Sequence, residues 1–190
     1  MGRTPTLRHL TSRHMLHAGE IRIRPARAAD ASPVARLIES VVAEDRWFLA
    51  APEEHVADPD RLRPRLERLQ AEQNSLALVA IRAGEIVGFV EATGGSLRRT
   101  AHESHVIVYV DGVHRNGGVG TTLMAELIRR ACERPGMMRL ALAVFADNLR
   151  AVSLYRSLGF SEEGLRRGAC RERDGVLRDE ILMALDVSGG

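Results

Sequence analysis

The stretch VHRNGGVGTTLM, residues 113–124, joins an apolar segment to a run of apolar residues at helical spacing. Directly after Arg115 it holds Gly117, Gly118 and Gly120, so very flexible residues stand at a strand-to-helix junction. One interpretation is a glycine-rich turn. The other is a loop whose backbone N–H groups, at the positive end of a helix dipole, face a bound anion.

Two common phosphate-binding loops do not fit this stretch. A Walker loop ends in Gly-Lys-Ser/Thr, and all 27 basic residues of this chain are arginine. A dinucleotide fingerprint requires a third glycine where the chain has Leu123, and it belongs to repeated βαβ units. What remains is Arg-x-x-Gly-x-Gly, in which Gly118 and Gly120 let a ligand approach the main chain. Arg115 adds a charge suited to phosphate.

Length and composition limit the number of domains, the kinds of partner and the cellular setting that this chain is expected to have. A chain of 190 residues with 45% hydrophobic residues can bury the core of one domain. The formal net charge of +2 does not favour nucleic acid, and no apolar run is long enough to cross a membrane. Two cysteines are too few for a disulfide framework and indicate a reducing, cytoplasmic setting.

The first 19 residues differ from the rest of the chain. They carry arginines and three histidines, have no acidic residue before Glu20, and lack the apolar segment of a signal peptide. An arginine-rich presequence is conceivable, but we expect residues 1–19 to be a disordered tail or to precede a true start at Met15. Residues 20–187 are then expected to form a single domain.

The periodicity of the remaining chain predicts the element order β-α-α-β-β-β-α-β-α-β-β. Asp30 is expected to cap the first helix, and Ala83-Gly84 to form a tight hairpin turn. The alternating or continuously apolar segments predict strands at 20–26, 76–82, 85–92, 102–110, 138–145 and 178–185. Apolar residues at helical spacing predict helices at about 31–42, 58–72, 119–134 and 148–158. This order predicts a single mixed α/β layer structure.

A second motif, VFADNLRAVSLYRSLGF at residues 144–160, contains Asn148, Leu154, Tyr155, Gly159 and Phe160. Together with the glycine stretch, it resembles the two signatures of the GNAT N-acetyltransferase superfamily. The resemblance extends from residue 21 to 185. It implies an α/β fold with a mixed, mostly antiparallel twisted sheet, a splayed parallel strand pair and about four flanking helices.

The resemblance also implies acetyl-CoA as the acyl donor and no metal. The pantetheine arm is expected between the strands at 106–110 and 140–144, and the pyrophosphate on the N–H groups of the glycine loop. A bulge in the first splayed strand is implied, although no glycine or proline marks it. The expected cofactor-binding residues are Val108, Tyr109, Val110, Arg115, Asn116, Gly117, Gly118, Val119, Gly120, Thr121 and Asn148.

Tyr155 matches the family tyrosine that protonates the leaving thiolate, a general-acid role. The alternative is an amphipathic tyrosine that only packs in the core, and the matching Asn148 and Leu154 favour the catalytic role. Asn148 is expected both to cap its helix and to touch the cofactor or a nearby water.

The general base is open among three candidates. Relatives often carry a glutamate about ten residues before the loop arginine, where this chain has His105, with Glu103 on the same strand face. Histidine titrates near neutral pH, which suits a base that acts through water. Ordered water alone is the third candidate. His102 and Glu103 point to opposite faces of a strand, which argues against a metal site.

The acceptor is expected to meet the N-terminal helices, the loop EDRWFLAAPEEHVAD that connects them at residues 44–58, and the loop before the last strand. Trp47 and Phe48 either wall a substrate pocket or pack in the core, and the latter is expected of at least one. The carboxylates of Glu44, Asp45, Glu53 and Glu54 favour a cationic amine, although a solvated loop has the same composition.

The sequence therefore predicts an N-acetyltransferase that acts on the primary amine of a small molecule or amino acid by direct attack. A protein N-terminus is the alternative acceptor, and a non-catalytic acyl-CoA-binding subunit is the alternative from another class. No nucleic acid or membrane partner is expected. The final strand is a candidate surface for a homodimer, since family members often pair through edge strands.

Overall fold

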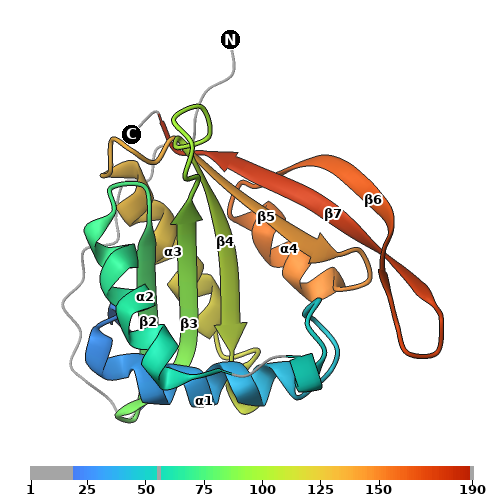
Figure 1. Ribbon diagram of the computed structural model, residues 1–190, viewed down its shortest axis with the longest axis horizontal. Helices are drawn as coiled ribbons and strands as arrows, with labels where there is room; N and C mark the ends of the chain where they lie inside the picture. Colours follow the sequence, from blue (N-terminus) through green and yellow to red (C-terminus); the bar gives the residue numbers. More distant parts are fainter. Residues whose placement is uncertain (1–18, 55–56, 189–190) are drawn as a thin grey trace.

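Seven strands form one sheet in the order β1-β2-β3-β4-β5-β7-β6 in the computed structural model, which describes residues 19–54 and 57–188 (Figure 1). The strands are β1 Arg22–Pro25, β2 Leu76–Arg82, β3 Glu85–Gly94, β4 Glu103–Val110, β5 Arg139–Phe145, β6 Ser161–Arg171 and β7 Leu177–Asp186. The helices are α1 Ala31–Val42, α2 Pro59–Ala71, α3 Val119–Cys132 and α4 Leu149–Ser157. The predicted element order is confirmed. The tail expected over residues 1–19 lies, apart from its last residue, outside the described residues.

Local signals place several of the element boundaries. Ala83 and Gly84 both have positive φ, 50° and 86°, as a two-residue hairpin turn requires. The Asp58 carboxylate accepts a hydrogen bond from the N–H of Asp60 (2.9 Å) and caps α2, with Pro59 in the first helical position.

Asp30 is the N-cap residue of α1, as expected, but its side chain forms no capping hydrogen bond with that helix. Asp30 precedes the helix, but its carboxylate accepts from the Arg24 guanidinium (2.6 and 2.7 Å) and from the N–H of Arg27 (2.7 Å). The Arg24 side chain holds the pKa of Asp30 below its usual value. The ion pair between Arg24 and Asp30 connects β1 to the start of α1. The carboxylate of Asp30 pairs with Arg24 rather than with the N–H groups of α1 because a hydrogen bond from a charged donor is stronger than one from a backbone N–H.

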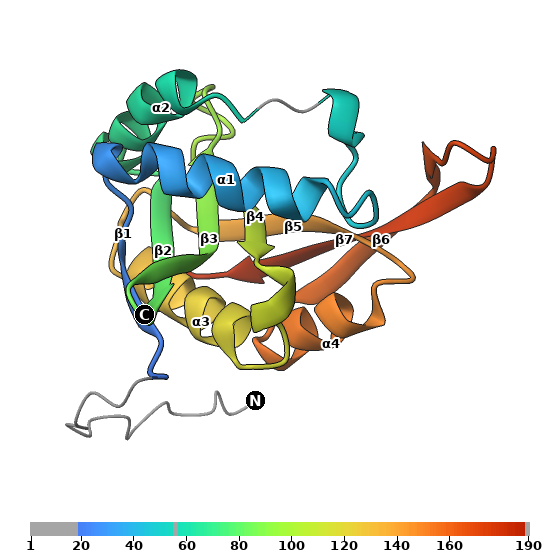
Figure 2. The same cartoon turned by 90° about the horizontal axis from the view of Figure 1, so that it is seen from below.

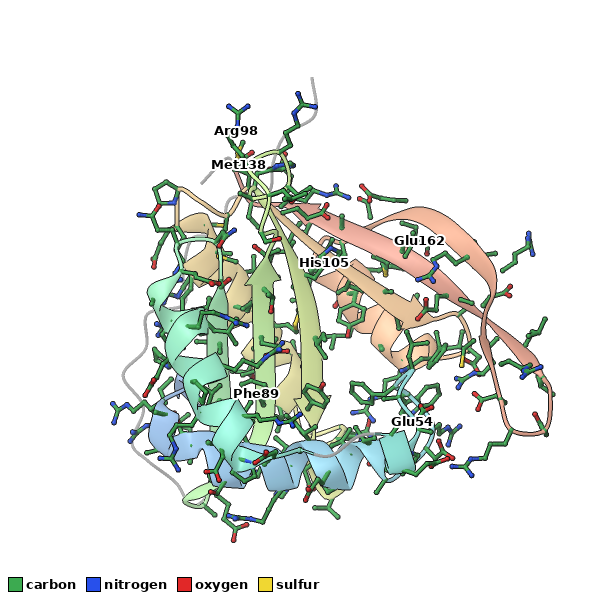
Figure 3. All side chains as sticks on the ribbon, viewed as in Figure 1. Glu54, Phe89, Arg98, His105, Met138 and Glu162 are labelled. Carbon is green, nitrogen blue, oxygen red and sulfur yellow. The ribbon has the colours of Figure 1, made fainter. Side chains whose placement is uncertain are left out.

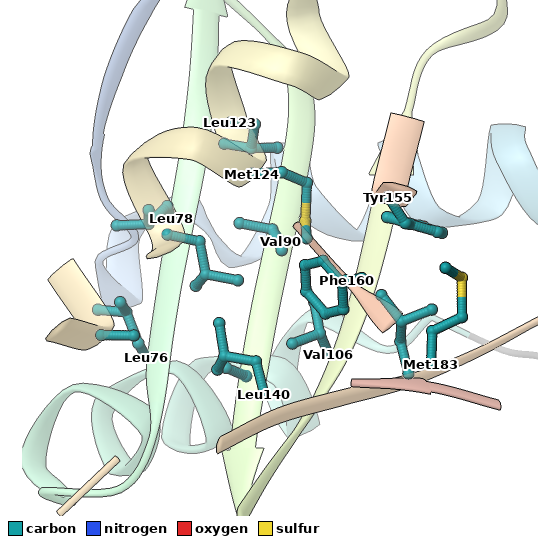
Figure 4. Packing of buried hydrophobic residues seen from close by; sticks show 14 of the residues in the cluster. Leu76, Leu78, Val90, Val106, Leu123, Met124, Leu140, Tyr155, Phe160 and Met183 are labelled. Carbon is teal, nitrogen blue, oxygen red and sulfur yellow. The ribbon is translucent and has the colours of Figure 1, made fainter. Parts of the chain in front are cut away.

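The helices cover the two faces of the sheet in pairs. Figure 2 shows α1 and α2 on one side and α3 and α4 on the other. Because alternate strand residues point to opposite faces, Val106 packs with α3 and α4, whereas Tyr109 packs with α1 and α2. Figure 4 shows the first of these cores, in which Tyr155 of α4 lies near Phe160 and Met183.

The one parallel pair, β4 with β5, is short and then opens. It is paired at Glu103–Arg139, Ser104–Leu140 and His105–Ala141, and beyond these residues the two strands diverge (Figure 1). On its other edge β4 stays paired with β3 as far as Val110. The predicted splayed pair is confirmed, and residues 106–110 are left with an edge that no strand covers.

The bulge expected in β4 is not present. Its pairing with β3 runs without a shift in register from Ser104 to Val110, and the shifts lie instead in the β2–β3 and β6–β7 pairs.

Within residues 19–54 and 57–188, no helix has the length and apolar character needed to cross a membrane.

Candidate active site

A cavity of about 1110 Å³ occupies the gap between β4 and β5. Its walls come from both strands, the glycine loop, α4 and the segment after α1. Figure 3 shows His105 where the two strands begin to separate. The expected site residues that line it are His105, Val108, Tyr109, Val110, Arg115, Asn116, Gly118, Val119, Gly120, Thr121, Asn148 and Tyr155. The gap therefore brings together most of the residues that the two motifs single out.

The glycine loop ends in a backbone arrangement that exposes N–H groups. Asn116 and Gly118 have positive φ, 62° and 81°, and Gly118 is the N-cap of α3. The N–H of Thr122 donates the first bond of the helix, to the carbonyl of Gly118 (2.9 Å). The N–H groups of the three helical residues before it have no acceptor within the helix, so they are available to an anion.

Gly120 lines the cavity where the glycine loop faces α4. A Cβ built on Gly120 would lie 3.5 Å from Leu154 Cδ2 and 3.7 Å from Val110 Cγ2. A glycine therefore leaves free the space that a side chain would fill at the point where β4, α3 and α4 meet.

Arg115 has a second set of partners that its motif does not predict. Its guanidinium forms two hydrogen bonds with the Glu44 carboxylate (2.5 and 2.6 Å), and its Nε donates to the carbonyl of Val110 (3.1 Å). The side chain thus joins the glycine loop to the end of β4 and to the segment after α1. A phosphate contact by Arg115 would compete with this pairing.

Tyr155 lies in the cavity wall with a buried ring. The residue is 7% exposed, and its ring is tilted against Phe160 at a centroid distance of 5.8 Å. Burial raises the pKa of the Tyr155 hydroxyl to about 12. No hydrogen-bond partner for this hydroxyl occurs among the described residues. The group is therefore protonated at neutral pH and can donate a proton to a species in the cavity.

Asn148 caps α4, as expected. Its Oδ1 accepts from the N–H of Ala151 (3.2 Å), and the residue also lines the cavity. The cap fixes the start of the helix that carries Tyr155.

The two candidate bases differ in their surroundings. Glu103 Oε2 accepts from Arg139 Nε (2.6 Å), while Oε1 lies 3.4 Å from His105 Nε2. His105 lines the cavity and its side chain is 71% exposed, whereas Glu103 does not line it in the described part of the chain. The geometry makes His105 the better-placed of the two.

Gly117 of the glycine loop, an expected cofactor-binding residue, is also outside the cavity lining. A Cβ built on Gly117 would lie 3.1 Å from Arg82 Nη1.

The segment after α1 covers the face of the sheet opposite α4. Trp47 and Phe48 both line the cavity, and Phe48 also stacks on Tyr109 with ring centroids 4.7 Å apart. Phe48 thus packs against the core and lines the cavity at once, so both expected roles apply to it.

The carboxylates of this segment are largely neutralised. Glu44 pairs with Arg115, and Asp45 and Glu53 pair with Arg173 from the β6–β7 turn. In the described part of the chain, the acidic residue that does line the cavity is Glu180 of β7, which no sequence motif indicated.

In the described part of the chain, no group of three His, Cys, Asp or Glu side chains could hold a metal ion.

Comparison with known proteins gives one family and several relatives. A model of the acetyltransferase (GNAT) family matches residues 39–160. The L-amino acid N-acetyltransferase AaaT of Escherichia coli is 33% identical over 118 residues, which are 62% of this chain and 72% of that protein. The ribosomal protein bS18-alanine N-acetyltransferase of Escherichia coli is 40% identical over 81 residues, 43% of this chain and 53% of that protein.

The fold has counterparts among solved structures. The structure of yncA from Salmonella typhimurium with its cofactor acetyl-CoA has a TM-score of 0.79 and 21% sequence identity. The match covers 90% of this chain and 95% of that one. The sheet with its single parallel pair is therefore an arrangement that known proteins share.

Proposed function

Since this chain belongs to the acetyltransferase (GNAT) family and is an N-acetyltransferase, we propose that its acceptor is the primary amine of an amino acid or another small molecule. The observation that carries the proposal is the cavity between β4 and β5, which has free N–H groups at one end and Tyr155 in its wall. The likeness to an L-amino acid N-acetyltransferase supports an amino acid as the acceptor.

Acetyl-CoA is the donor, and the cavity offers hydrogen-bond donors and acceptors for its pyrophosphate and its pantetheine arm. The pyrophosphate would accept hydrogen bonds from the N–H groups at the start of α3, where the helix dipole is favourable. The amides of the pantetheine arm would pair with the uncovered edge of β4 at residues 106–110, as an added strand does. The thioester would then lie near the point where β4 and β5 separate.

The reaction is direct attack of the neutral amine on the thioester carbon. The new C–N bond forms a tetrahedral intermediate, and the C–S bond then breaks with the electron pair leaving on sulfur. The Tyr155 hydroxyl would give its proton to that sulfur, and the acceptor nitrogen would lose one proton to a base. An uncovered N–H of β4 would stabilise the charge on the carbonyl oxygen.

His105 is the proposed base, acting directly or through water. We expect His105→Ala to lower kcat/KM for the acceptor by about tenfold or more at neutral pH. The loss should shrink as the pH rises, because the amine then deprotonates unaided. The measurement is a pH profile of kcat/KM.

The matched control is Glu103→Ala on the same strand face. Arg139 holds the Glu103 carboxylate and His105 lies 3.4 Å from its other oxygen, so this variant should change the profile through the surroundings of His105 and by less than His105→Ala does. If both variants keep the wild-type profile, water alone is the base.

The pair between Arg115 and Glu44 predicts a link between the two halves of the site. In Glu44→Gln the segment after α1 loses its tie to the glycine loop, so the acceptor KM should rise by up to about fivefold. Acetyl-CoA affinity should not weaken, because Arg115 becomes free to approach the phosphates. Glu133→Gln, which breaks an exposed pair with Arg129 on α3, is the control. A weaker acetyl-CoA affinity with an unchanged acceptor KM would contradict this link.

A protein N-terminus is the second candidate acceptor, favoured by the likeness to an enzyme that acetylates ribosomal protein bS18. The test is release of free CoA thiol from acetyl-CoA with a panel of L-amino acids, their amides, simple amines and an alanyl peptide. Fastest turnover with a free amino acid or small amine supports the proposal, and fastest turnover with the peptide supports the second candidate. Binding of acetyl-CoA without thiol release for any amine would instead support a non-catalytic acyl-CoA-binding protein.

A further inference from the structure

Glu180 is a buried carboxylate in the wall of the cavity. It is 4% exposed and lies on β7 beside Phe145 of β5 and Arg166 of β6. Its Oε2 accepts from Arg166 Nη1 (2.9 Å), whereas its Oε1 has no hydrogen-bond donor among the described residues. A buried carboxylate requires compensation by charge or hydrogen bonds, and here one of its two oxygens is left to the cavity.

Glu180 shares the cavity with aromatic and with basic side chains. In the described part of the chain it is the only acidic residue that lines the cavity, together with the aromatic side chains of Trp47, Phe48, Tyr109 and Phe145. Arg46, Arg115 and Arg150 also line the cavity, so among its lining residues in the described part of the chain Oε1 of Glu180 is the anionic group that a cation can meet. Beside the aromatic side chains this charge is less screened than it would be in bulk solvent.

Arg178 holds this part of the cavity in place. Its guanidinium lies 3.9 Å from the ring centroid of Phe145 and 5.4 Å from that of Trp47. It also donates to the carbonyl of Arg46 (2.8 Å) and to the carboxylate of Asp147 (2.7 Å). The segment that carries Trp47 is thereby fastened beside the strands that carry Phe145 and Glu180, and the compartment exists before any ligand binds.

We propose that Glu180 receives the ammonium group of the acceptor through Oε1, and that the wall formed by Trp47 and Phe48 contacts an apolar substituent next to it. The acceptor class is thus a primary amine that enters as a cation and carries an apolar group close to its nitrogen. The ammonium group loses one proton to His105 or to water before the neutral nitrogen attacks the thioester, and the nitrogen loses its second proton when the amide forms. This inference rests on the proposed function, because it takes the cavity to be the acceptor site. Glu180 replaces the acidic segment after α1 as the source of selectivity for cations, because among the described residues the carboxylates of that segment do not line the cavity, whereas Glu180 does and only its Oε2 is paired with Arg166.

The test compares Glu180→Gln with the wild-type enzyme on the best acceptor of the amine panel. Glutamine keeps the shape of the side chain and removes the charge, so the acceptor KM should rise by about tenfold or more, the range of a hydrogen bond to a charged group. The acetyl-CoA Kd should stay within about twofold of wild type, since the pyrophosphate and pantetheine contacts lie elsewhere.

Glu91→Gln is the matched control. Glu91 is 5% exposed and pairs with Arg65 (2.7 and 3.0 Å), so it is another buried carboxylate held by an arginine. It does not line the cavity in the described part of the chain. Its loss should lower the melting temperature without raising the acceptor KM.

An unchanged acceptor KM in Glu180→Gln, with normal wild-type turnover, overturns the role of Glu180 and leaves the proposed function standing. Absence of wild-type turnover with every amine overturns both.

Should Glu180→Gln fail to fold, inhibition of the wild-type enzyme decides. The N,N-dimethylated acceptor, a tertiary ammonium ion, should compete with the acceptor at least about tenfold better than the analogue with a neutral isopropyl group in its place. Equal inhibition by the two compounds overturns the proposal.

Discussion

Replacing Tyr155 with phenylalanine is expected to lower kcat by about 10²–10⁴-fold, the usual contribution of a well-placed general acid. The ring, its contact with Phe160 and its burial are all kept, and only the hydroxyl is lost. Because the described residues offer that hydroxyl no hydrogen-bond partner, the melting temperature should not fall. The acetyl-CoA Kd should change by no more than the value of one neutral hydrogen bond, about 0.5–1.5 kcal/mol.

A tyrosine that only packs in the core would instead leave kcat near normal, because phenylalanine keeps the ring and its contacts. The pH dependence adds a second check. Burial raises the pKa of Tyr155 to about 12, so its proton is present at every pH below that value. Raising the pH from 7 to 10 should therefore increase the rate as the amine deprotonates, with no decline from ionisation of Tyr155. Near-normal kcat in Tyr155→Phe would remove this residue from the mechanism.

Gly118→Val is expected to weaken acetyl-CoA binding by well over tenfold, about 1.4 kcal/mol or more. No protein atom lies within 4 Å of a Cβ built on Gly118, so the added side chain would meet the bound pyrophosphate instead of the fold. The positive φ of 81° adds backbone strain that also affects stability. The measurement is calorimetric titration with acetyl-CoA.

Gly84→Val separates strain from ligand contact. Gly84 has a φ of 86° and equally open space, but it lies in the β2–β3 turn. Both variants should lose a similar amount of stability, and only the change at position 118 should weaken binding. Equal acetyl-CoA affinity in the two variants would contradict the phosphate-binding role of the glycine loop.

Local patterns predicted the fold because each element carries its own signal. The hairpin at Ala83-Gly84 and the helix that follows Gly118 depend on residues adjacent in sequence. Asp30 is the N-cap residue of α1 as expected, but its carboxylate does not cap the helix because it pairs with Arg24 on β1, a contact that the helix pattern does not include. Tyr155 was placed by a motif with fixed spacing, and its catalytic role stays a prediction.

The acceptor compartment could not be read in the same way. Glu44 finds its partner Arg115 at a distance of 71 residues along the chain, and Glu53 finds Arg173 at 120 residues. These pairings decide which carboxylates carry a free charge. The alternation of residues along β7 predicts which face of the sheet Glu180 occupies. It does not predict that this face lines a cavity, because the cavity also depends on β4, β5 and the segment after α1.

The central claim is that this cavity joins an acetyl group from acetyl-CoA to an amine. The most direct measurement follows free CoA thiol and acetylated product together, by colorimetry and mass spectrometry, with the best amine of the panel. The account predicts one acetylated amine for each thiol released, at a rate that depends on amine concentration and falls sharply in Tyr155→Phe. Thiol release that is independent of every amine, with no acetylated product, would contradict it.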